Sequence, residues 1–251
     1  MRRRWWIMGA GLIVVIVAAV ILTVVLNRPE NTAGPETSST GAATTSKYGF
    51  PVSPIRVGEG GRELAPDGKT RIGYGPSCQE AAQAVLNYAS FGYSTEKPNM
   101  DALTKTAPMI FATQDDVASR LYLITSLAEE APAGAIQVNP AAPGLFKIVK
   151  CTEGDSAFIM SVTSSVDARP AVNQASMAMS FEEVRYVGGT WKSTEDAVSK
   201  AGVAAEFGQS VSQPASEGFV KITPEVINRL FTSDEGKPLS RDGWFEVSNA
   251  Q

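Results

Sequence analysis

The stretch QASMAMSFEEVRYVGGTWKST, residues 174–194, decides the fold. The large apolar residues of its first half alternate with small or polar ones, a period of two that predicts one face of a β-strand: Met177, Met179 and Phe181. The apolar side then switches to Val184 and Tyr186, which predicts a bulge near Glu182-Glu183. Gly188-Gly189 has the composition of a two-residue hairpin turn, so TWKST should return as an antiparallel strand.

Two further strands are predicted upstream, over residues 145–151 and 157–166, joined by the turn TEGD at 152–155. In the second of them, apolar residues again fall at alternate positions and share a face: Phe158, Met160, Val162 and Val166. Successive strands joined by tight turns favour antiparallel pairing. The middle of the chain therefore predicts a meander of about four strands.

Three helices are predicted before the strands. Ser77 with Glu80 three residues later matches a capping box, and apolar residues then recur at helical spacing. A second short helix is predicted from Asn99 to Phe111, and a third begins at Thr113 and stops before Pro132. The fold class is therefore α+β, with three helices packed on an antiparallel sheet of about four strands, in a domain at residues 77–195.

The first residues predict a membrane anchor. After a cytoplasmic end at residues 1–4, the run at 5–26 has no charged residue and is long enough for a transmembrane helix. A cleaved signal peptide is the alternative, but it would have a shorter apolar core and a small-residue cleavage site. The anchor's basic and interfacial residues lie at its start: Arg2, Arg3, Arg4, Trp5 and Trp6. The positive-inside bias then predicts a single-pass plasma-membrane protein with a cytoplasmic N-terminus and an extracellular C-terminal domain.

The segments that flank the predicted domain have a different composition. Residues 27–47 are rich in Thr, Ser, Ala, Gly and Pro and predict a flexible stalk. Residues 48–76 predict an extended lead-in, and residues 196–251 a partly ordered C-terminal extension. Within that extension, TPEVINRLF at 223–231 predicts a short helix with Pro at its first position, and RDGWFEV at 241–247 a terminal strand or docking segment.

The charge balance limits the partners. Outside Arg2, Arg3 and Arg4 the chain has 19 basic and 26 acidic residues, a net charge of −7. A nucleic-acid-binding domain would present a basic face, so we expect no nucleic-acid partner. The expected partners are the lipid bilayer, through the N-terminal helix, and other envelope proteins, including other copies of this chain.

Familiar catalytic and metal-binding patterns are missing from the sequence. The chain has no histidine and only two cysteines, which excludes Ser-His-Asp or Cys-His catalysis and the usual zinc sites. It also has no Walker motif and no dinucleotide fingerprint. The string STEK at 94–97 matches the S-x-x-K of serine acyl-enzymes, but it precedes Pro98 in a predicted loop. We therefore expect no catalytic residue, no metal and no cofactor, and hence no enzyme.

Paired carboxylates and tyrosines have simpler interpretations. Adjacent residues diverge on a helix and point to opposite faces of a strand, so we expect solvated surface charge at three pairs: Asp115-Asp116, Glu129-Glu130 and Glu182-Glu183. Three tyrosines fall on predicted core-forming elements, and we expect them to pack there: Tyr88, Tyr122 and Tyr186.

Cys78 and Cys151 are predicted to form a disulfide. Cys78 opens the first predicted helix on its apolar side, and Cys151 closes the strand at 145–151. Two exported cysteines tend to pair. The alternatives are two structural free thiols, or a reactive Cys78 thiol whose pKa is lowered by the helix N-terminus.

The sequence resembles a family of envelope proteins. The segments RIGYGPSCQEAAQAVLNYA at 71–89, GGTWK at 188–192 and the Gly-Trp pair at 243–244 are similar to membrane-anchored accessory proteins of integrative conjugative elements in high-GC Gram-positive bacteria. Those proteins are type IV secretion scaffold components. The resemblance implies a cystatin-like, nuclear-transport-factor-two-like exported domain and carries over no catalytic residue. The cysteine pair departs from the family's pattern.

These observations favour a non-enzymatic function. The first hypothesis is a cell-envelope scaffold or adaptor that tethers partners of a conjugation or secretion machinery at the outer face of the plasma membrane. The alternative is a ligand-binding or lipid-transport accessory protein that uses a pocket in the predicted cone. An open apolar pocket of several hundred Å³ would favour the alternative.

The disulfide prediction is testable by mass spectrometry. We expect the native chain to show no thiol that reacts with an alkylating reagent until a reductant is added, because both cysteines are paired. Alkylation of Cys78 and Cys151 in the unreduced native protein would contradict the pairing.

Overall fold

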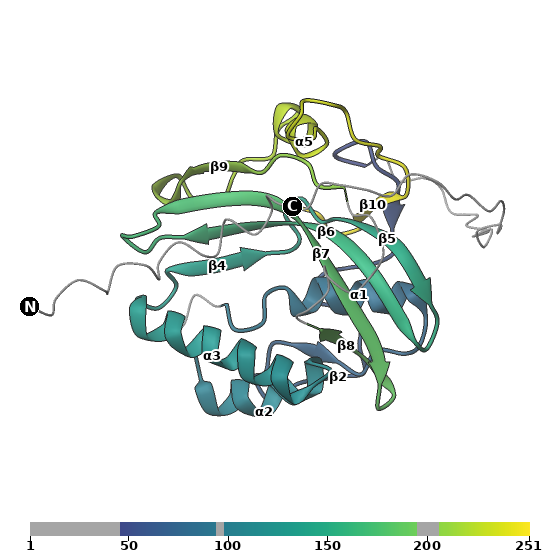
Figure 1. Ribbon diagram of the computed structural model, residues 1–251, viewed down its shortest axis with the longest axis vertical. Helices are drawn as coiled ribbons and strands as arrows, with labels where there is room; N and C mark the ends of the chain where they lie inside the picture. Colours follow the sequence, from purple (N-terminus) through teal and green to yellow (C-terminus); the bar gives the residue numbers. More distant parts are fainter. Residues whose placement is uncertain (1–45, 94–97, 195–205) are drawn as a thin grey trace, which may run out of the picture. The chain divides into compact units, whose positions relative to one another are not determined.

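The computed structural model describes residues 46–93, 98–194 and 206–251, which belong to one compact unit, Ala42–Gln251 (Figure 1). Its helices are α1 (Cys78–Tyr88), α2 (Met100–Ile110), α3 (Gln114–Glu130), the 3₁₀ turn η1 (Ala215–Glu217) and α5 (Pro224–Leu230). Its strands are β1 (Val52–Ser53), β2 (Glu63–Leu64), β3 (Arg71–Ile72), β4 (Ile136–Asn139), β5 (Leu145–Thr152), β6 (Ser156–Asp167), β7 (Gln174–Val187), β8 (Thr190–Thr194), β9 (Val211–Pro214) and β10 (Trp244–Val247).

The hairpin of β6 and β7 organises the main sheet. Its antiparallel register runs without a shift from Ser156 opposite Arg185 to Asp167 opposite Gln174. Each of these long strands has two successive neighbours on its outer edge, β5 then β4 beside β6, and β8 then β9 beside β7. Beyond β5, β10 pairs antiparallel with it, and β1 pairs parallel with β10. Strands β2 and β3 form a separate small sheet.

The predicted fold class is wrong in the size of the sheet. Among the described residues the main sheet has eight strands instead of about four, and so it is not the predicted cystatin-like cone. Of the four additional strands, only β10 was predicted, as the terminal strand or docking segment at 241–247, and its place in the sheet was not. All four have two to four residues each, too few to show a period of two: β1, β4, β9 and β10. Two of them, β9 and β10, come from the predicted C-terminal extension.

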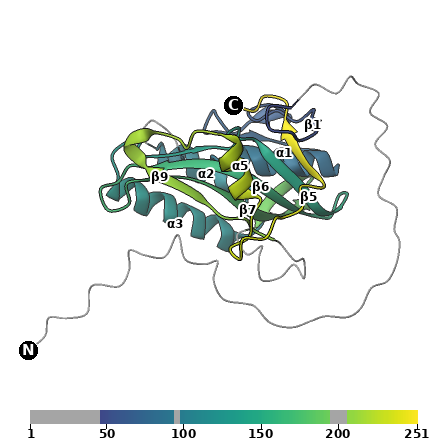
Figure 2. The ribbon, with the colours of Figure 1, turned by 90° about the horizontal axis from the view of Figure 1, so that it is seen from above.

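Apolar side chains cover both faces of the β6–β7 hairpin. One face carries Ala157, Ile159 and Val184, which join a core with α1, α2 and α3. The other face carries side chains such as Phe158 and Phe181, which pack with the C-terminal segment at 206–251. Figure 1 shows α2 and α3 on one side of the sheet and α5 on the other, and from above α5 lies over β6 and β7 (Figure 2).

The two-sided burial also corrects the predicted bulge near Glu182-Glu183. The β6–β7 register is continuous there, and the irregularity lies instead in β5, between Ile148 and Lys150. The large apolar residues change from odd to even positions along β7 because each face of this strand packs against a different core. The Gly188-Gly189 turn is confirmed, with Val187 opposite Thr190 and positive φ at both glycines.

The predicted helices are present, and their caps explain where they begin. Ser77 accepts a hydrogen bond from the Glu80 N–H, and the Glu80 carboxylate accepts from the Ser77 hydroxyl and the Gly75 N–H. At α3, Thr113 and Asp116 form a full capping box. Such caps satisfy backbone N–H groups that have no partner inside the helix.

The first described residues of the compact unit are hydrogen-bonded to its C-terminal segment and pack against it. The backbone N–H groups of Lys47 and Tyr48 donate to the Glu246 carboxylate of β10, which is almost fully buried. The rings of Phe50 and Trp244 both pack against Phe231. The lead-in that emerges from the predicted stalk is therefore held at the edge of the sheet by the C-terminal segment.

No helix of the described residues is long and apolar enough to cross a bilayer. The predicted span at 5–26, its flanking residues Arg2 to Trp6, and nearly all of the stalk at 27–47 lie outside the described residues, as does the STEK string at 94–97.

Gly208 tests whether the C-terminal segment is packed as described. A Cβ on Gly208 would lie 1.6 Å from the Leu230 carbonyl oxygen, so Gly208→Ala must displace the end of α5. We expect a loss of about 2–3 kcal/mol in the free energy of unfolding, measured by urea denaturation, as for other overpacked sites. The matched variant Ser216→Ala, at an exposed position of the same segment, should change it by less than about 0.5 kcal/mol. Equal urea midpoints for the two variants would contradict the packing.

Candidate functional site

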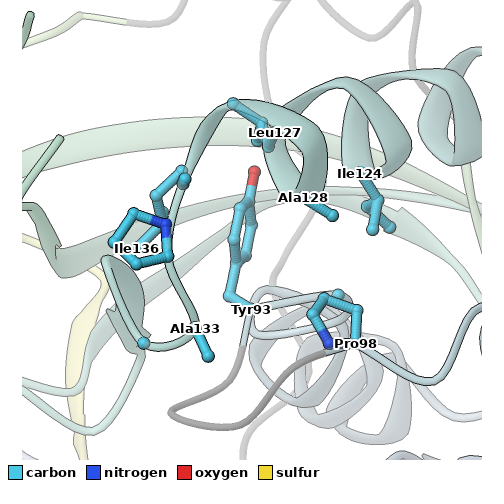
Figure 3. A pocket seen from close by; sticks show the side chains of 11 residues that line it. Tyr93, Pro98, Ile124, Leu127, Ala128, Ala133 and Ile136 are labelled. Atoms are coloured by element: carbon cyan, nitrogen blue, oxygen red, sulfur yellow. The ribbon is translucent and has the colours of Figure 1, made fainter.

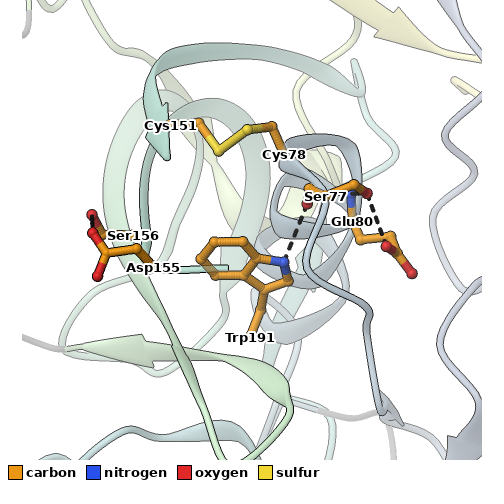
Figure 4. Close-up of a disulfide and its surroundings, with 7 residues drawn as sticks. All are labelled: Ser77, Cys78, Glu80, Cys151, Asp155, Ser156 and Trp191. Atoms are coloured by element: carbon orange, nitrogen blue, oxygen red, sulfur yellow. Dashed lines mark hydrogen bonds between the residues drawn. A yellow bond between two sulfur atoms is a disulfide. The ribbon is translucent and has the colours of Figure 1, made fainter. Parts of the chain in front are cut away.

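The cysteine pair is structural. Cys78 and Cys151 are joined in a disulfide with an S–S distance of 2.05 Å, and the chain has no free cysteine (Figure 4). The predicted pairing is thus present, and neither sulfur is a reactive thiol or a metal ligand. The bridge spans 73 residues, for which the chain-entropy model gives about 4 kcal/mol of stabilisation.

The surroundings of the disulfide form a tightly bonded end of the sheet. Trp191 is fully buried and donates from its indole nitrogen to the Ser77 carbonyl at 3.2 Å. The Gly154 N–H donates to the Pro76 carbonyl at 2.9 Å, which ties the β5–β6 turn to the residue pair that precedes α1. These two hydrogen bonds join the start of α1 to β8 and to the β5–β6 turn, so together with the disulfide they hold α1 on the sheet.

The three tyrosines behave differently from one another. Tyr88 is buried and donates to the Trp191 carbonyl, and Tyr186 packs edge-on against the Trp191 ring. Burial raises the pKa of the Tyr88 phenol above its ordinary value and that of Tyr74 to about 12, so both stay protonated. The packing prediction is wrong for Tyr122, which is 77% exposed on the outer side of α3.

The carboxylate pairs also differ. Asp115, Glu129 and Glu130 are exposed, as expected for surface charge, whereas Asp116 is buried in its capping box. The surface prediction is wrong for Glu182 and Glu183, which lie in β7 between the two cores. Their side chains do point to opposite faces, because β7 is regular at that point.

Glu182 is the most unusual ionisable group on the helix-facing side of the sheet. It lies opposite Ile159 of β6, a member of the helix-facing core. Part of its residue surface is accessible, but packed atoms desolvate the carboxyl group and raise its pKa to about 7. The positive charge of Arg120 and a 3.5 Å hydrogen bond from the Ser193 hydroxyl lower the pKa to a smaller extent.

Arg120 connects this carboxylate to the loop after α1. It extends from α3, donates from Nη2 to the Phe91 carbonyl at 3.3 Å, and its guanidinium carbon lies 5.1 Å from the centre of the Tyr93 ring. Its Nε is buried without a hydrogen-bond partner among the described residues. A cation over an aromatic face is attracted by the ring quadrupole, so Arg120 fixes the position of Tyr93.

Tyr93 also lines an apolar pocket of about 260 Å³ (Figure 3). The pocket lies between the second half of α3, the loop after α1 and the start of β4. Gly92 has a φ of +81°, and a Cβ there would lie 2.3 Å from Ile124 Cδ1, so a side chain would not fit. The lining residues are uncharged: Gly92, Tyr93, Pro98, Ile124, Leu127, Ala128, Ala131, Pro132, Ala133, Gly134 and Ile136.

A second hollow of about 320 Å³ shares Gly92, Tyr93 and Pro98 with the first. Its wall is more polar and includes Asp67 and Lys69. Asp67 is already used, because its carboxylate accepts from the Thr70 hydroxyl and from nearby backbone N–H groups. The Asp67 carboxylate in the wall of this hollow is therefore held by its own turn.

The candidate site is thus the apolar pocket, with Arg120 and Glu182 behind its Tyr93 wall. Within the described residues, no group of three His, Cys, Asp or Glu side chains could hold a metal ion. Comparisons with protein-family models, curated proteins and solved structures found no match to this chain. The sequence analysis did not find Glu182 as a buried group, although its place between Phe181 and Val184, which face different cores, was a usable signal.

Glu182 should make the stability of the protein depend on pH. Its pKa is about 7 in the folded state against an ordinary 4.5, so between these values the folded state binds more protons than the unfolded state. The free energy of unfolding should therefore fall as pH rises from about 4.5 to 7, by up to about 3 kcal/mol. Glu182→Gln should remove this fall in urea denaturation series collected across that range.

Ser193→Ala is the companion variant. It removes the hydroxyl that lowers the pKa of Glu182, so the fall in stability should extend to higher pH. The interpretation is wrong if Glu182→Gln keeps the wild-type slope between pH 4.5 and 7.

Proposed function

We propose that this chain is a membrane-anchored, non-enzymatic adaptor of the cell envelope, which holds partners of a conjugation or secretion machinery at the outer face of the plasma membrane. The disulfide is the single observation that carries this proposal. Disulfides persist outside the cytoplasm and are rare within it. The basic residues before the apolar run at 5–26 independently predict the same side of the membrane for the compact unit.

The way the chain enters the compact unit supports a tethering role. Lys47 and Tyr48 bond to Glu246, and β1 runs parallel to β10 beside it. The residues that would follow a tether, from residue 46 onward, are thus bonded to the edge of the sheet. Domains on a tether meet their partners at a raised effective concentration, which needs no catalytic chemistry.

The connection to a conjugation or secretion machinery rests on the resemblance of three segments. In this fold the segment at 71–89 supplies β3 and α1, GGTWK at 188–192 supplies the β7–β8 turn, and the Gly-Trp pair at 243–244 leads into β10. These segments are parts of the folded unit, so the resemblance concerns its framework and assigns no site residue.

A ligand-binding function is the second candidate, and the apolar pocket is the observation that favours it. Its volume of about 260 Å³ lies just below the usual range of about 300–1,000 Å³ for small-molecule sites. That size suits one small apolar group and is too small for a lipid with two acyl chains. The apolar pocket thus restricts this candidate to a small ligand, while the second, more polar hollow of about 320 Å³ lies within that range.

A topology and crosslinking experiment tests the adaptor proposal in cells. Alkaline phosphatase fused after Gln251 should be active, because the enzyme needs an environment outside the cytoplasm. A photo-crosslinking amino acid placed at an exposed apolar residue should yield discrete adducts with envelope proteins at one or more of three positions: Tyr122, Val187 or Phe245. An inactive fusion, or adducts absent at all three positions, would contradict the proposal.

A further inference from the structure

The C-terminal end of α3 is left uncapped beside the apolar pocket. Pro132 has no N–H group and so cannot donate to the Ala128 carbonyl four residues earlier. The last helical bond runs from the Ala131 N–H to the Leu127 carbonyl. Among the hydrogen bonds of the described residues, none is accepted by the carbonyls of Ala128, Glu129 or Glu130. Ala128, Ala131 and Pro132 also line the pocket, so the end of α3 to which these carbonyls belong forms part of its rim.

This rim is electronegative. The C-terminus of a helix has a partial negative charge that is best matched by Lys or Arg, and the last turn of α3 has no basic residue. It has Glu129 and Glu130 instead, both exposed. Arg169 approaches from the β6–β7 turn, but it is shared between Glu130 at 3.1 Å and Asp167 at 2.7 Å. Asp167 lies opposite Ile136 of the pocket wall, so the guanidinium that is shared by two carboxylates lies beside the site, and the exposed Glu129 adds a further negative charge at the helix end.

The pocket and its rim therefore favour two different chemical groups on one partner. The interior is uncharged and apolar and would bind an aliphatic group, whereas the rim offers carbonyl oxygens and carboxylates to a cation. The compact unit is acidic as well, since the chain outside Arg2, Arg3 and Arg4 has a net charge of −7. A cationic partner would thus be attracted both at the rim and at longer range.

We infer that this site docks a segment of a partner protein in which a large aliphatic residue lies next to Lys or Arg. The aliphatic side chain fills the pocket against Leu127 and Ile136, and the ammonium or guanidinium group donates to the uncapped carbonyls at Ala128 to Glu130. This inference rests on the proposed adaptor function, for which it names the partner's chemistry and the contact site.

A peptide titration tests the inference on the full chain in phosphatidylcholine nanodiscs. The probe is a fluorescein-labelled peptide, GSGKLLKGSG, followed by fluorescence anisotropy. We expect saturable binding that weakens as salt is raised, because the rim contacts are between exposed charges. Replacing both leucines with serine, or both lysines with glutamate, should abolish binding to the unaltered protein, a readout that does not depend on the folding of any variant.

Two pairs of protein variants locate the site. Ala128→Trp fills the pocket and should weaken binding about tenfold, equivalent to about 1.4 kcal/mol, whereas Ala118→Trp, on the exposed side of the same helix, should not. Glu129→Lys should weaken binding about threefold by reversing a charge at the helix end. Glu153→Lys makes the same charge change in the exposed β5–β6 turn and should leave the affinity within about twofold.

Several results would overturn the inference. These are equal affinities for Ala128→Trp and Ala118→Trp, undiminished binding of the serine peptide, or binding of hexylammonium chloride in the absence of peptide binding. The last result would assign the site to a small amphiphile. The adaptor proposal would survive any of them if the crosslinked envelope adducts are still obtained, and an inactive phosphatase fusion would overturn the adaptor proposal alone.

Discussion

The burial of both faces of the β6–β7 hairpin is the constraint on which the rest of the structure depends. A strand that places Val184 on one side and Phe181 on the other cannot leave either face to water, because each exposed apolar side chain would forfeit about 1.5–3 kcal/mol. The hairpin therefore needs two covering layers. Helices α1 to α3 form one. The C-terminal segment forms the other through η1 and α5, while its strands β9 and β10 extend the sheet itself and add side chains to the same core.

The location of the candidate site follows from how the helical layer is held. Helix α1 contacts β3 and four strands of the main sheet and is joined to β5 by the disulfide, whereas α3 packs chiefly on α2 and on the loop after α1. Gly92 lets that loop approach Ile124, and Arg120 binds its Phe91 carbonyl and Tyr93 ring. Helix α3 ends at Glu130, two residues before Pro132, and the apolar pocket opens between this helix end and β4. Glu182 lies near Arg120 in the same region. Desolvation of its carboxyl group raises its pKa to about 7.

The parts of the fold that the sequence predicted are those with local signals. Ser77 and Thr113 mark helix starts, Gly188-Gly189 marks a hairpin, and Cys78 with Cys151 were the only available disulfide partners. The short strand β1 has no such signal, because its partner β10 is distant in sequence. The segment that forms β10 was predicted only as a terminal strand or docking segment, without its partners. The neighbouring bond from the Val57 N–H to Asn249 joins residues 192 positions apart. The pocket was missed for the same reason, since its walls come from a loop, a helix end and a short strand, and Glu182 was missed because a pair of acidic residues was assumed to be solvated.

The most direct test of the account is whether the C-terminal layer unfolds together with the sheet that it covers. Hydrogen–deuterium exchange of the full chain, read by mass spectrometry, reports the opening free energy of each segment. The two-layer constraint predicts that the amides of β10 and α5 are protected from exchange as strongly as those of β6 and β7. It also predicts that all of these amides lose protection together in mild denaturant. Fast exchange across residues 206–251 while β6, β7 and the helices stay protected would contradict it, because the second face of the hairpin would then be stable without its cover.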